Sequence, residues 1–309
     1  MNRIIKMIFL TILAISILTA PALGTITESE ALTTAEKYSK SSENIIVYGL
    51  YTYQNVPYYF IIFSPTYAQK MTSGCVVINA EDGEIASKDV AEKIIIAECT
   101  EFAVGDTYME FLENEIAYYK ERDEILKTDI MALKNMSGLV QETAKFDKII
   151  ETVQNVEKIN LAVVESMEQT ETAAKEFRAG NKSYEKAMEY QNAYNKYVSA
   201  LEELVAIDDE YVNQAMVYYE LDTINYDSGS FSWKIDKDEW LFRHRTEMTT
   251  TKDVLDHEKW YQTIYDGDVK YFTENNRTTE NKSLIPGFSL IVAAFALLIV
   301  GLLIKKQKK

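Results

Sequence analysis

The sequence predicts a small α+β domain at the N-terminus, followed by a mainly α-helical region that forms a long hairpin or three-helix bundle, and a C-terminal transmembrane helix. Three features lead to this fold class: β-branched and aromatic runs near the start, apolar residues at helical spacing through the middle, and an uncharged stretch near the end. Only 11 of the 309 residues are Gly and 4 are Pro. Long regular elements are therefore expected, because residues that break helices and strands are rare.

Residues 1–24 have the order of a signal peptide. Arg3 and Lys6 precede an apolar run from Met7 to Leu18, and small residues follow. The run is shorter than the roughly 20 residues that a membrane span requires. We expect cleavage before Thr25, and the alternative is an uncleaved N-terminal anchor.

Residues 25–100 are predicted to form the α+β domain. Apolar residues at helical spacing indicate helices, and dense Ile, Val, Tyr and Phe indicate strands. The expected order is helix, three strands and helix, at 28–39, 45–53, 58–64, 76–79 and 88–99. A tight connection is expected at 54–57, and an acidic turn in which Gly83 supplies a positive φ.

The strand Tyr58-Tyr59-Phe60-Ile61-Ile62 and the segment from Val76 to Ile85 with its acidic-Gly turn, in this order of elements, resemble a PepSY-like domain. The resemblance implies an extracellular binding or inhibitory module, sometimes directed at proteases, without catalytic residues. The tyrosines of this domain suit either a carbohydrate or peptide platform or, as we expect, packing against helices and over the sheet. They are Tyr48, Tyr51, Tyr53, Tyr58 and Tyr59.

Cys75 and Cys99 are the only two cysteines of the chain. Both fall in the part that we expect to be exported, so a disulfide between them is favoured over two buried thiols. It would stabilise the fold by about 3 kcal/mol in the chain-entropy model. No zinc site is expected, because neither cysteine has a histidine cluster near it.

Residues 105–225 have the clearest periodicity. Apolar or small residues recur at alternating spacings of three and four from Ile149 to Phe177, and again from Tyr184 to Tyr219. Two such seams of similar length predict an antiparallel coiled-coil hairpin. Its tip is expected at Gly180, which can end one helix, and Asn181, which can cap the next.

An earlier helix at 106–136 has the same spacing and is expected to complete a three-helix bundle. The polar residues that interrupt the apolar seams include Asn160 and Asp208. We expect them to fix the register of the helices or to hold a water molecule, rather than to bind a ligand.

Residues 226–272 are expected to form a membrane-proximal segment that contains both histidines, His244 and His257. A cluster of polar residues in this segment has the residue types of metal ligands: Asp253, Asp256, His257 and Glu258. Adjacent positions on a helix point in different directions and no second histidine lies four residues on, so we expect a solvated helix face rather than a metal site. Asp266-Gly267 predicts a turn that closes a short hairpin.

Residues 284–309 are expected to anchor the protein in a membrane, after a polar stalk at 273–283. The 21 residues from Leu284 to Ile304 carry no charge, which is enough to span a bilayer, and four lysines follow them. A basic tail stays on the cytosolic side, so residues 25–283 are expected outside the cell.

The tripeptide Pro286, Gly287 and Phe288, the apolar stretch behind it and the basic tail resemble the PGF-CTERM sorting signal of archaeal surface proteins. The resemblance implies that an archaeosortase cuts near the tripeptide and that a membrane lipid replaces the helix. The chain differs from the family pattern in having Ser289 where a second Gly is common, and a short polar stalk where a long Thr-rich one is common. A plain transmembrane anchor is the alternative.

The chain has 48 acidic and 32 basic residues, a balance that excludes nucleic acid as a partner. Once Arg3, Lys6 and the four tail lysines are set aside, the exported part carries a net charge of −22. Four glycosylation sequons lie at predicted turns or in the stalk, where a sugar can be accepted. They are Asn135, Asn181, Asn276 and Asn281, and Asn181 is the preferred site.

The two histidines and 11 glycines form no nucleophile–histidine–acid pattern and no phosphate-binding loop, so neither catalysis nor a cofactor is expected. We therefore expect a non-catalytic, cell-surface protein of an archaeal envelope with a structural or binding role. The alternative is a protease-inhibitory or sensory accessory ectodomain that acts through a membrane partner. A hydrolase would require a pocket with clustered ionisable groups near His244 and His257.

Overall fold

The structure is a computed structural model, and it describes residues 25–66, 72–137, 143–180, 182–220 and 237–278. These residues form six helices and one three-stranded antiparallel sheet, so the described chain is mostly helical, with its sheet near the N-terminus, as the sequence predicts. They divide into two compact units. The first contains residues 25–98 and 269–278, and the second contains residues 99–268.

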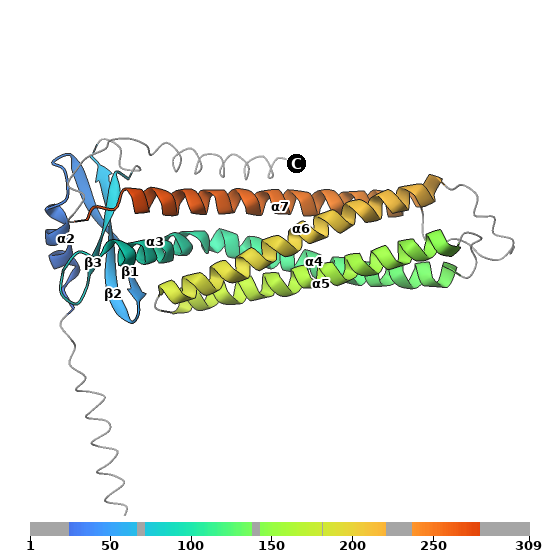
Figure 1. Ribbon diagram of the computed structural model, residues 1–309, viewed down its shortest axis with the longest axis horizontal. Helices are drawn as coiled ribbons and strands as arrows, with labels where there is room; N and C mark the ends of the chain where they lie inside the picture. The colour runs from blue at the N-terminus through green and yellow to red at the C-terminus, as the bar shows by residue number, and fades with distance from the viewer. Residues whose placement is uncertain (1–24, 67–71, 138–142, 181, 221–236, 279–309) are drawn as a thin grey trace, which may run out of the picture. The chain divides into compact units, whose positions relative to one another are not determined.

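The first unit is built around the sheet. Its elements are α2 (Glu28–Glu36), β1 (Glu43–Tyr53), β2 (Val56–Pro65), β3 (Gly74–Asn79) and the first part of α3 (Lys88–Ala103). The strands are hydrogen-bonded in chain order and α2 covers one face of the sheet (Figure 1). The core on this face consists of Ala31, Ala35, Ile61, Phe63, Val76 and Ile78.

The two turns expected from the sequence are confirmed. Gln54 and Asn55 have φ values of 51° and 65°, the left-handed backbone that a two-residue hairpin requires, and they join β1 to β2. Gly83 has a φ of 76°. The expected packing role of the tyrosines holds for Tyr51 and Tyr58, which are 1% and 8% exposed, whereas Tyr48 is 54% exposed.

The last residues of the long C-terminal helix and those that follow it, 269–278, belong to the first unit, although the expected boundaries of 25–100 do not include them. The Phe272 ring meets the Phe60 ring edge-on at 5.4 Å. The Arg277 guanidinium binds both carboxylate oxygens of Glu43, at 2.7 and 2.8 Å, and lies 4.0 Å over the Phe63 ring. These contacts fix residues 269–278 to the sheet.

In the described chain Cys75 and Cys99 are both buried thiols, so the expected disulfide is not present there. The Cys75 Sγ lies 3.5 Å from the Phe272 carbonyl oxygen and 3.9 Å from the Asn276 Oδ1. Burial raises the pKa of the Cys75 thiol well above its usual range. The residue therefore serves as a small buried side chain with a weak donor.

The second unit contains four long helices. They are α4 (Asp106–Ser137), α5 (Thr143–Ala179), α6 (Tyr184–Glu220) and α7 (Lys237–Glu274), of which the last turns of α7 belong to the first unit. The predicted antiparallel hairpin is formed by α5 and α6, which run side by side (Figure 1). Its seam is buried as the spacing predicts. The buried seam includes Val153, Val156, Val163, Met167 and Phe177 of α5, and Ala187, Tyr194, Val198 and Leu201 of α6.

The hairpin tip lies where the sequence predicts, between Ala179 and Tyr184. The Ser183 hydroxyl accepts a hydrogen bond from the Lys186 amide at 3.2 Å, so Ser183 caps α6. Asn181, the residue expected to cap this helix, lies outside the described residues.

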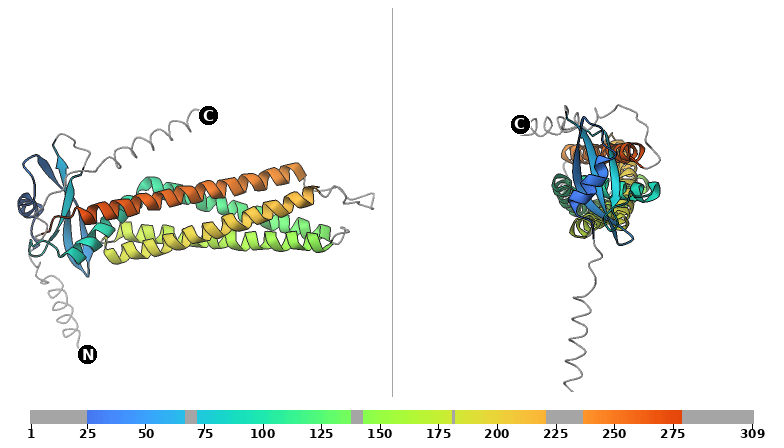
Figure 2. Two further views of the ribbon diagram at one scale, coloured as in Figure 1. Left: turned by 45° about the horizontal axis from the view of Figure 1, so that its top comes forward. Right: turned by 90° about the vertical axis from the view of Figure 1, so that its left-hand side faces the viewer.

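Two predictions for the segment after α6 are wrong. Asp266 and Gly267 lie inside α7 rather than in a turn, so α7 is one continuous helix of 38 residues and no short hairpin forms there. The α7 helix also contacts α4 and α6, which makes a bundle of four helices instead of three (Figure 2). Packing along α7 outweighs the roughly 1 kcal/mol that one glycine costs in a helix.

No helix among the described residues is both long enough and apolar enough to cross a membrane. The predicted signal peptide, the predicted span at 284–304 and the tripeptide Pro286-Gly287-Phe288 lie outside the described residues.

Candidate functional site: a buried charge network on α4, α6 and α7

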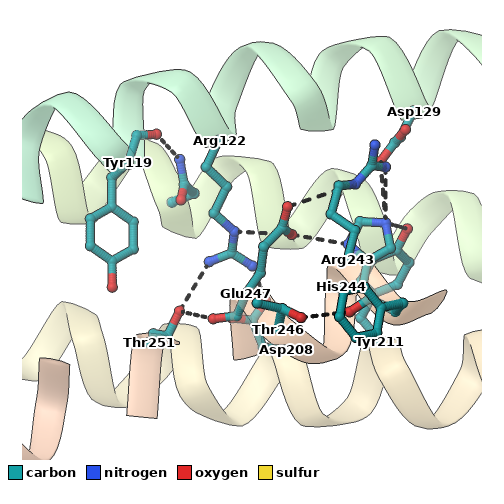
Figure 3. A network of polar contacts seen from close by, with 12 residues as sticks. Tyr119, Arg122, Asp129, Asp208, Tyr211, Arg243, His244, Thr246, Glu247 and Thr251 are labelled. Atoms are coloured by element: carbon teal, nitrogen blue, oxygen red, sulfur yellow. Dashed lines mark hydrogen bonds and ion pairs between the residues drawn. The ribbon is translucent and has the colours of Figure 1, made fainter. Parts of the chain in front are cut away.

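Ionisable side chains gather inside the second unit, between α4, α6 and α7 (Figure 3). We define this charge network as Arg122, Asp129, Asp208, Arg243, His244 and Glu247. All of them are buried except Arg243, whose side chain is 36% exposed. Such a density of buried charge is unusual, because each charge loses its hydration on folding.

Helix periodicity explains how the network residues come to lie together. On α4, Arg122 and Asp129 are seven residues apart, and on α7 His244 lies three residues before Glu247 and seven before Thr251. Residues at these spacings share one face of a helix. The network therefore occupies the faces of α4 and α7 that are turned toward each other and toward α6.

Arg122 connects all three helices. Its Nη2 lies 2.5 Å from the Asp208 Oδ1 of α6, and its Nε lies 3.5 Å from the Glu247 Oε2 of α7. Its Nη1 donates to the Thr251 hydroxyl at 3.3 Å. One guanidinium thus neutralises two buried carboxylates, a task that its planar arrangement of donors suits.

His244 has a carboxylate at each ring nitrogen. Its Nε2 lies 3.2 Å from the Asp129 Oδ2, and its Nδ1 lies 3.0 Å from the Glu247 Oε2. The Tyr211 hydroxyl lies 3.4 Å from the same Nε2. Only the imidazolium can donate to both carboxylates at once, so this geometry favours the cationic form.

The pKa directions agree with the geometry. Burial by itself would lower the pKa of His244, but the hydrogen bonds to Asp129 and Glu247 outweigh it and raise that pKa. Burial would likewise raise the pKa of Glu247, yet His244 and Arg122 lower it. Burial dominates only at Asp208, whose pKa is raised despite Arg122.

With His244 protonated, the network contains three cations and three carboxylates. The cations are Arg122, Arg243 and His244, and Asp129 accepts from the last two, at 2.5 Å and 3.2 Å. Charge balance of this kind offsets part of the desolvation cost. Loss of the His244 proton would leave one buried negative charge in excess.

Two polar residues of the predicted seams have structural contacts. The Asn160 Nδ2 donates to the Tyr119 carbonyl oxygen at 2.9 Å, which joins α5 to α4 and fits the expected role in fixing register. Asp208 pairs with Arg122. The sequence singles out Asp208 as an interruption of an apolar seam but does not identify its partner.

The polar cluster around His257 is only partly the expected solvated face. Asp253 and Asp256 are exposed and His257 is 40% exposed, but Glu258 is completely buried. The described residues contain no group of three or more His, Cys, Asp or Glu that is placed to hold a metal ion.

The predicted glycosylation sites have different surroundings. Asn135 is exposed on the last turn of α4. Asn276 is only 6% exposed and its Oδ1 faces the Cys75 thiol, so the expectation of an accessible sugar site there is wrong. Asn181 and Asn281 lie outside the described residues.

An open groove of about 440 Å³ lies on α5 and α6, away from the charge network. Carboxylates dominate its lining: Glu165, Glu168, Glu176 and Glu189, with Gln169, Thr172 and Ala173. It contains none of the network residues. The clustered ionisable groups near His244 therefore do not line this groove.

One pattern in the sequence of α6 is a weak indication that a further helix, and with it the charge network, lies against α6. On α6 a second set of large residues recurs every seven positions and is buried: Tyr190, Tyr197, Leu204 and Tyr211. This stripe lies beside the predicted seam and predicts a further helix packed against α6. The sequence does not single out Arg122, Asp129 or Glu247, because isolated charges on a helix are usually solvated.

Comparison with protein family models, with curated proteins and with solved structures gives no match for this chain. Its function is therefore inferred from its residues and their geometry.

Proposed function

We propose that this chain is a non-catalytic, cell-surface protein of an archaeal envelope, anchored at its C-terminus, with a structural or binding role. One observation carries the proposal for the described part: the ionisable groups around His244 are buried and paired with one another. Arg122, at 2% exposure, and Asp129, at 4%, would have to leave their ion pairs before they could meet a substrate. Such an arrangement supports a role in holding the helices together rather than a catalytic role.

The composition supports an exterior location. The expected exported part carries a net charge of −22, while six basic residues are confined to the two ends. An acidic surface of this kind keeps a protein soluble and repels anionic partners. We also assign the first unit to the PepSY-like type from its element order of helix, three antiparallel strands and helix.

Anchoring rests on Pro286, Gly287 and Phe288 and the segment behind them. We propose that an archaeosortase cuts near this tripeptide and that a lipid replaces the helix. Mass spectrometry of the mature protein should then find no peptide after Phe288. Replacement of the tripeptide by three alanines should leave the lysine tail attached, whereas the matched variant Ser289→Ala should still be processed. Lysine-tail peptides in stoichiometric amount in the natural protein would exclude processing and leave a plain transmembrane anchor.

One observation favours the alternative of a sensory accessory ectodomain. The charge balance around His244 depends on one proton, so external pH could change how α7 is held against α4. Pull-down from solubilised envelopes separates the two roles. A discrete membrane partner would support the accessory role, and bulk association with surface-layer material would support the structural one.

A further inference from the structure

The last described residues of the chain are held against the sheet of the first unit. Residues 275–277 form a parallel bridge with β3, in which the Cys75 amide donates to the Asn275 carbonyl oxygen at 3.2 Å. The Arg277 amide donates to the Cys75 carbonyl oxygen at 2.8 Å. The Tyr271 hydroxyl adds a hydrogen bond to the Thr72 carbonyl oxygen at 2.7 Å. Backbone and side-chain hydrogen bonds therefore fix the position at which the chain leaves this unit.

Arg277 places that exit at one end of the sheet. Its guanidinium binds Glu43, the first residue of β1, through two hydrogen bonds, and it donates to the Tyr38 carbonyl oxygen at 2.7 Å. Glu43 pairs with Pro65, the last residue of β2, so Arg277 lies at the end opposite the β1–β2 turn. We define the turn end of the unit by that turn. The clamp end is defined by the exposed residues Lys37, Lys40, Ser41, Ser42 and Thr66, together with Arg277.

The predicted membrane anchor begins a short distance along the chain from the clamp end. Five residues, 279–283, separate Thr278 from Leu284, the first residue of the predicted span. A chain reaches at most about 3.6 Å per residue whatever its conformation, so Thr278 and Leu284 lie within about 22 Å of each other. The proposed attachment of a lipid near Phe288 raises that limit to about 36 Å. Either form of anchoring therefore ties the clamp end close to the bilayer.

The length of the sheet disfavours the opposite orientation. The 11 residues of β1 rise about 3.3 Å each, so the strand spans roughly 33 Å from the clamp end to the turn end. If the turn end faced the bilayer, Thr278 would stand about that far above the lipid. The link to Leu284 is too short for this distance, and a link to Phe288 would have to be almost fully extended.

Charge distinguishes the two ends in the same sense. Ala80 joins the start of α2 and the loop after β3 to the turn end, because its amide donates to the Pro57 carbonyl oxygen at 2.9 Å and its carbonyl accepts from the Ile26 amide at 2.7 Å. Five exposed carboxylates gather there: Glu28, Glu30, Glu81, Asp82 and Glu84. At the clamp end the exposed residues Lys37 and Lys40 balance the exposed residues Glu36 and Glu274, and Arg277 neutralises Glu43. Phosphates of lipid headgroups repel the turn end and can bind the lysines of the clamp end.

We propose that the clamp end docks on the headgroup phosphates of the bilayer that anchors the chain, with the acidic turn end pointing away from it. The inference rests on the proposed C-terminal anchoring. The ammonium groups of Lys37 and Lys40 bind phosphate oxygens, and the neighbouring hydroxyls donate hydrogen bonds to them. The short link keeps lipid beside this end in every anchored molecule. A contact that is weak by itself is then populated, because its effective concentration is high.

Site-specific fluorescence of the full chain in phospholipid vesicles tests this contact. Ser41→Cys at the clamp end and Glu84→Cys at the turn end each carry a bimane label, and the vesicles contain phosphatidylcholine, phosphatidylglycerol and a lipid with a nitroxide on its headgroup. The natural chain measures background labelling of Cys75 and Cys99, which are 0% and 4% exposed. Quenching should be strong at position 41 and weak at position 84. Equal quenching at both positions would overturn the proposal, as would stronger quenching at position 84, which an uncleaved N-terminal anchor would produce.

Removal of one lysine separates a charge-assisted contact from simple proximity. In the chain labelled at Thr66→Cys, a second clamp-end site, Lys40→Gln should weaken the docked state about fivefold, because one lysine near an anionic surface strengthens attachment by about that factor. The matched variant Lys93→Gln removes a lysine that lies 5.0 Å over the Tyr53 ring at the turn end, and it should leave the quenching unchanged. Equal effects of the two variants would overturn the proposal.

Flotation of the same vesicles separates failure of this inference from failure of anchoring. A chain that floats with the vesicles but shows equal quenching at the two ends is anchored without docking, which overturns the inference alone. A chain that does not float has no anchor, which overturns the proposed anchoring together with the inference.

Discussion

The seam between α5 and α6 and the faces that α7 shares with α4 and α6 are built from different side chains. The seam is mainly apolar, with residues such as Val156, Val163 and Leu201 at 0% exposure. The α7 faces contain Arg122, His244 and many tyrosine rings. The first region gains stability by burying apolar surface, and the second must offset the desolvation of charges with ion pairs and hydrogen bonds.

This difference shows which helix contacts of a bundle can be predicted from the sequence alone. Apolar residues at coiled-coil spacing predict a close helix pair without knowledge of the partner. Charged residues at similar spacing predict a solvated face, unless their partners on another helix are known. The network thus gives α7 a definite position through pairings that apolar packing alone would not specify.

The largest effect is expected from removing the cation that joins the three helices. Arg122→Met should lower the free energy of unfolding by about 3–5 kcal/mol, because Asp208 and Glu247 then remain buried without their main cation. Chemical denaturation measures this change. The matched variant Lys259→Met breaks an ion pair with Glu202 whose partners are each 50% exposed, and should cost at most about 0.5 kcal/mol.

A loss below about 1 kcal/mol in Arg122→Met would show that the network is no more important than a surface pair. The triple variant Arg122→Met, Asp208→Leu and Glu247→Leu sharpens the comparison. It should recover much of the loss, because it leaves fewer uncompensated charges.

An effect nearly as large is expected in the apolar seam. Leu201→Ala should cost about 3 kcal/mol, since it leaves a cavity at a residue of 0% exposure. This loss should be the same across neutral pH, in contrast to losses in the network. Leu161→Ala, at a position that is 37% exposed, should cost clearly less in the same denaturation experiment.

A smaller effect is expected in the first unit at low pH. Burial would raise the pKa of Glu43, but the hydrogen bonds from Arg277, Ser73 and the Lys40 amide lower it from 4.5 to about 2. A lowered folded-state pKa contributes stability above the unfolded value, and this stability is lost as pH falls from about 4.5 to 2.

Glu43→Gln should therefore remove about 2 kcal/mol at pH 7 and reduce the acid dependence of unfolding. Denaturation of both forms between pH 7 and 3 measures the difference. The surface variant Glu36→Gln serves as the control and should keep the natural acid dependence. An unchanged acid slope in Glu43→Gln would contradict the assignment.

The smallest effect on the free energy of unfolding is expected from the titration of His244, the histidine of the charge network. The folded-state pKa of His244 is raised, so its contribution is complete below the unfolded value of about 6.5 and is lost as pH rises through the folded value. The free energy of unfolding should thus fall from neutral to alkaline pH, and His244→Gln should flatten this slope. His257→Gln, at a side chain that is 40% exposed, should keep it. A slope that survives in His244→Gln would place the titrating group elsewhere.

The predictions for the helical region are confirmed where they depend only on residues that are close together in the sequence. Gly180 and its surroundings gave the hairpin tip, and the buried positions from Ile149 to Phe177 follow the predicted seam. The predicted turn at Asp266-Gly267 is wrong. A glycine disfavours a helix by only about 1 kcal/mol, and the packing of α7 outweighs this local preference. The accessible sugar site expected at Asn276 failed for a related reason, since Asn276 is buried where it meets distant residues such as Cys75, 201 residues away.

The sequence by itself determined the element types, the positions of the two turns and the apolar seam, because hydrophobic period and backbone preference act over a few residues. The tertiary structure alone decided that α7 joins the bundle, that Arg122 meets Asp208 and Glu247, and that Glu258 is buried. The physical reason is that a charge on a helix has the same local pattern whether water or another helix faces it. Only the position of the distant partner distinguishes the two.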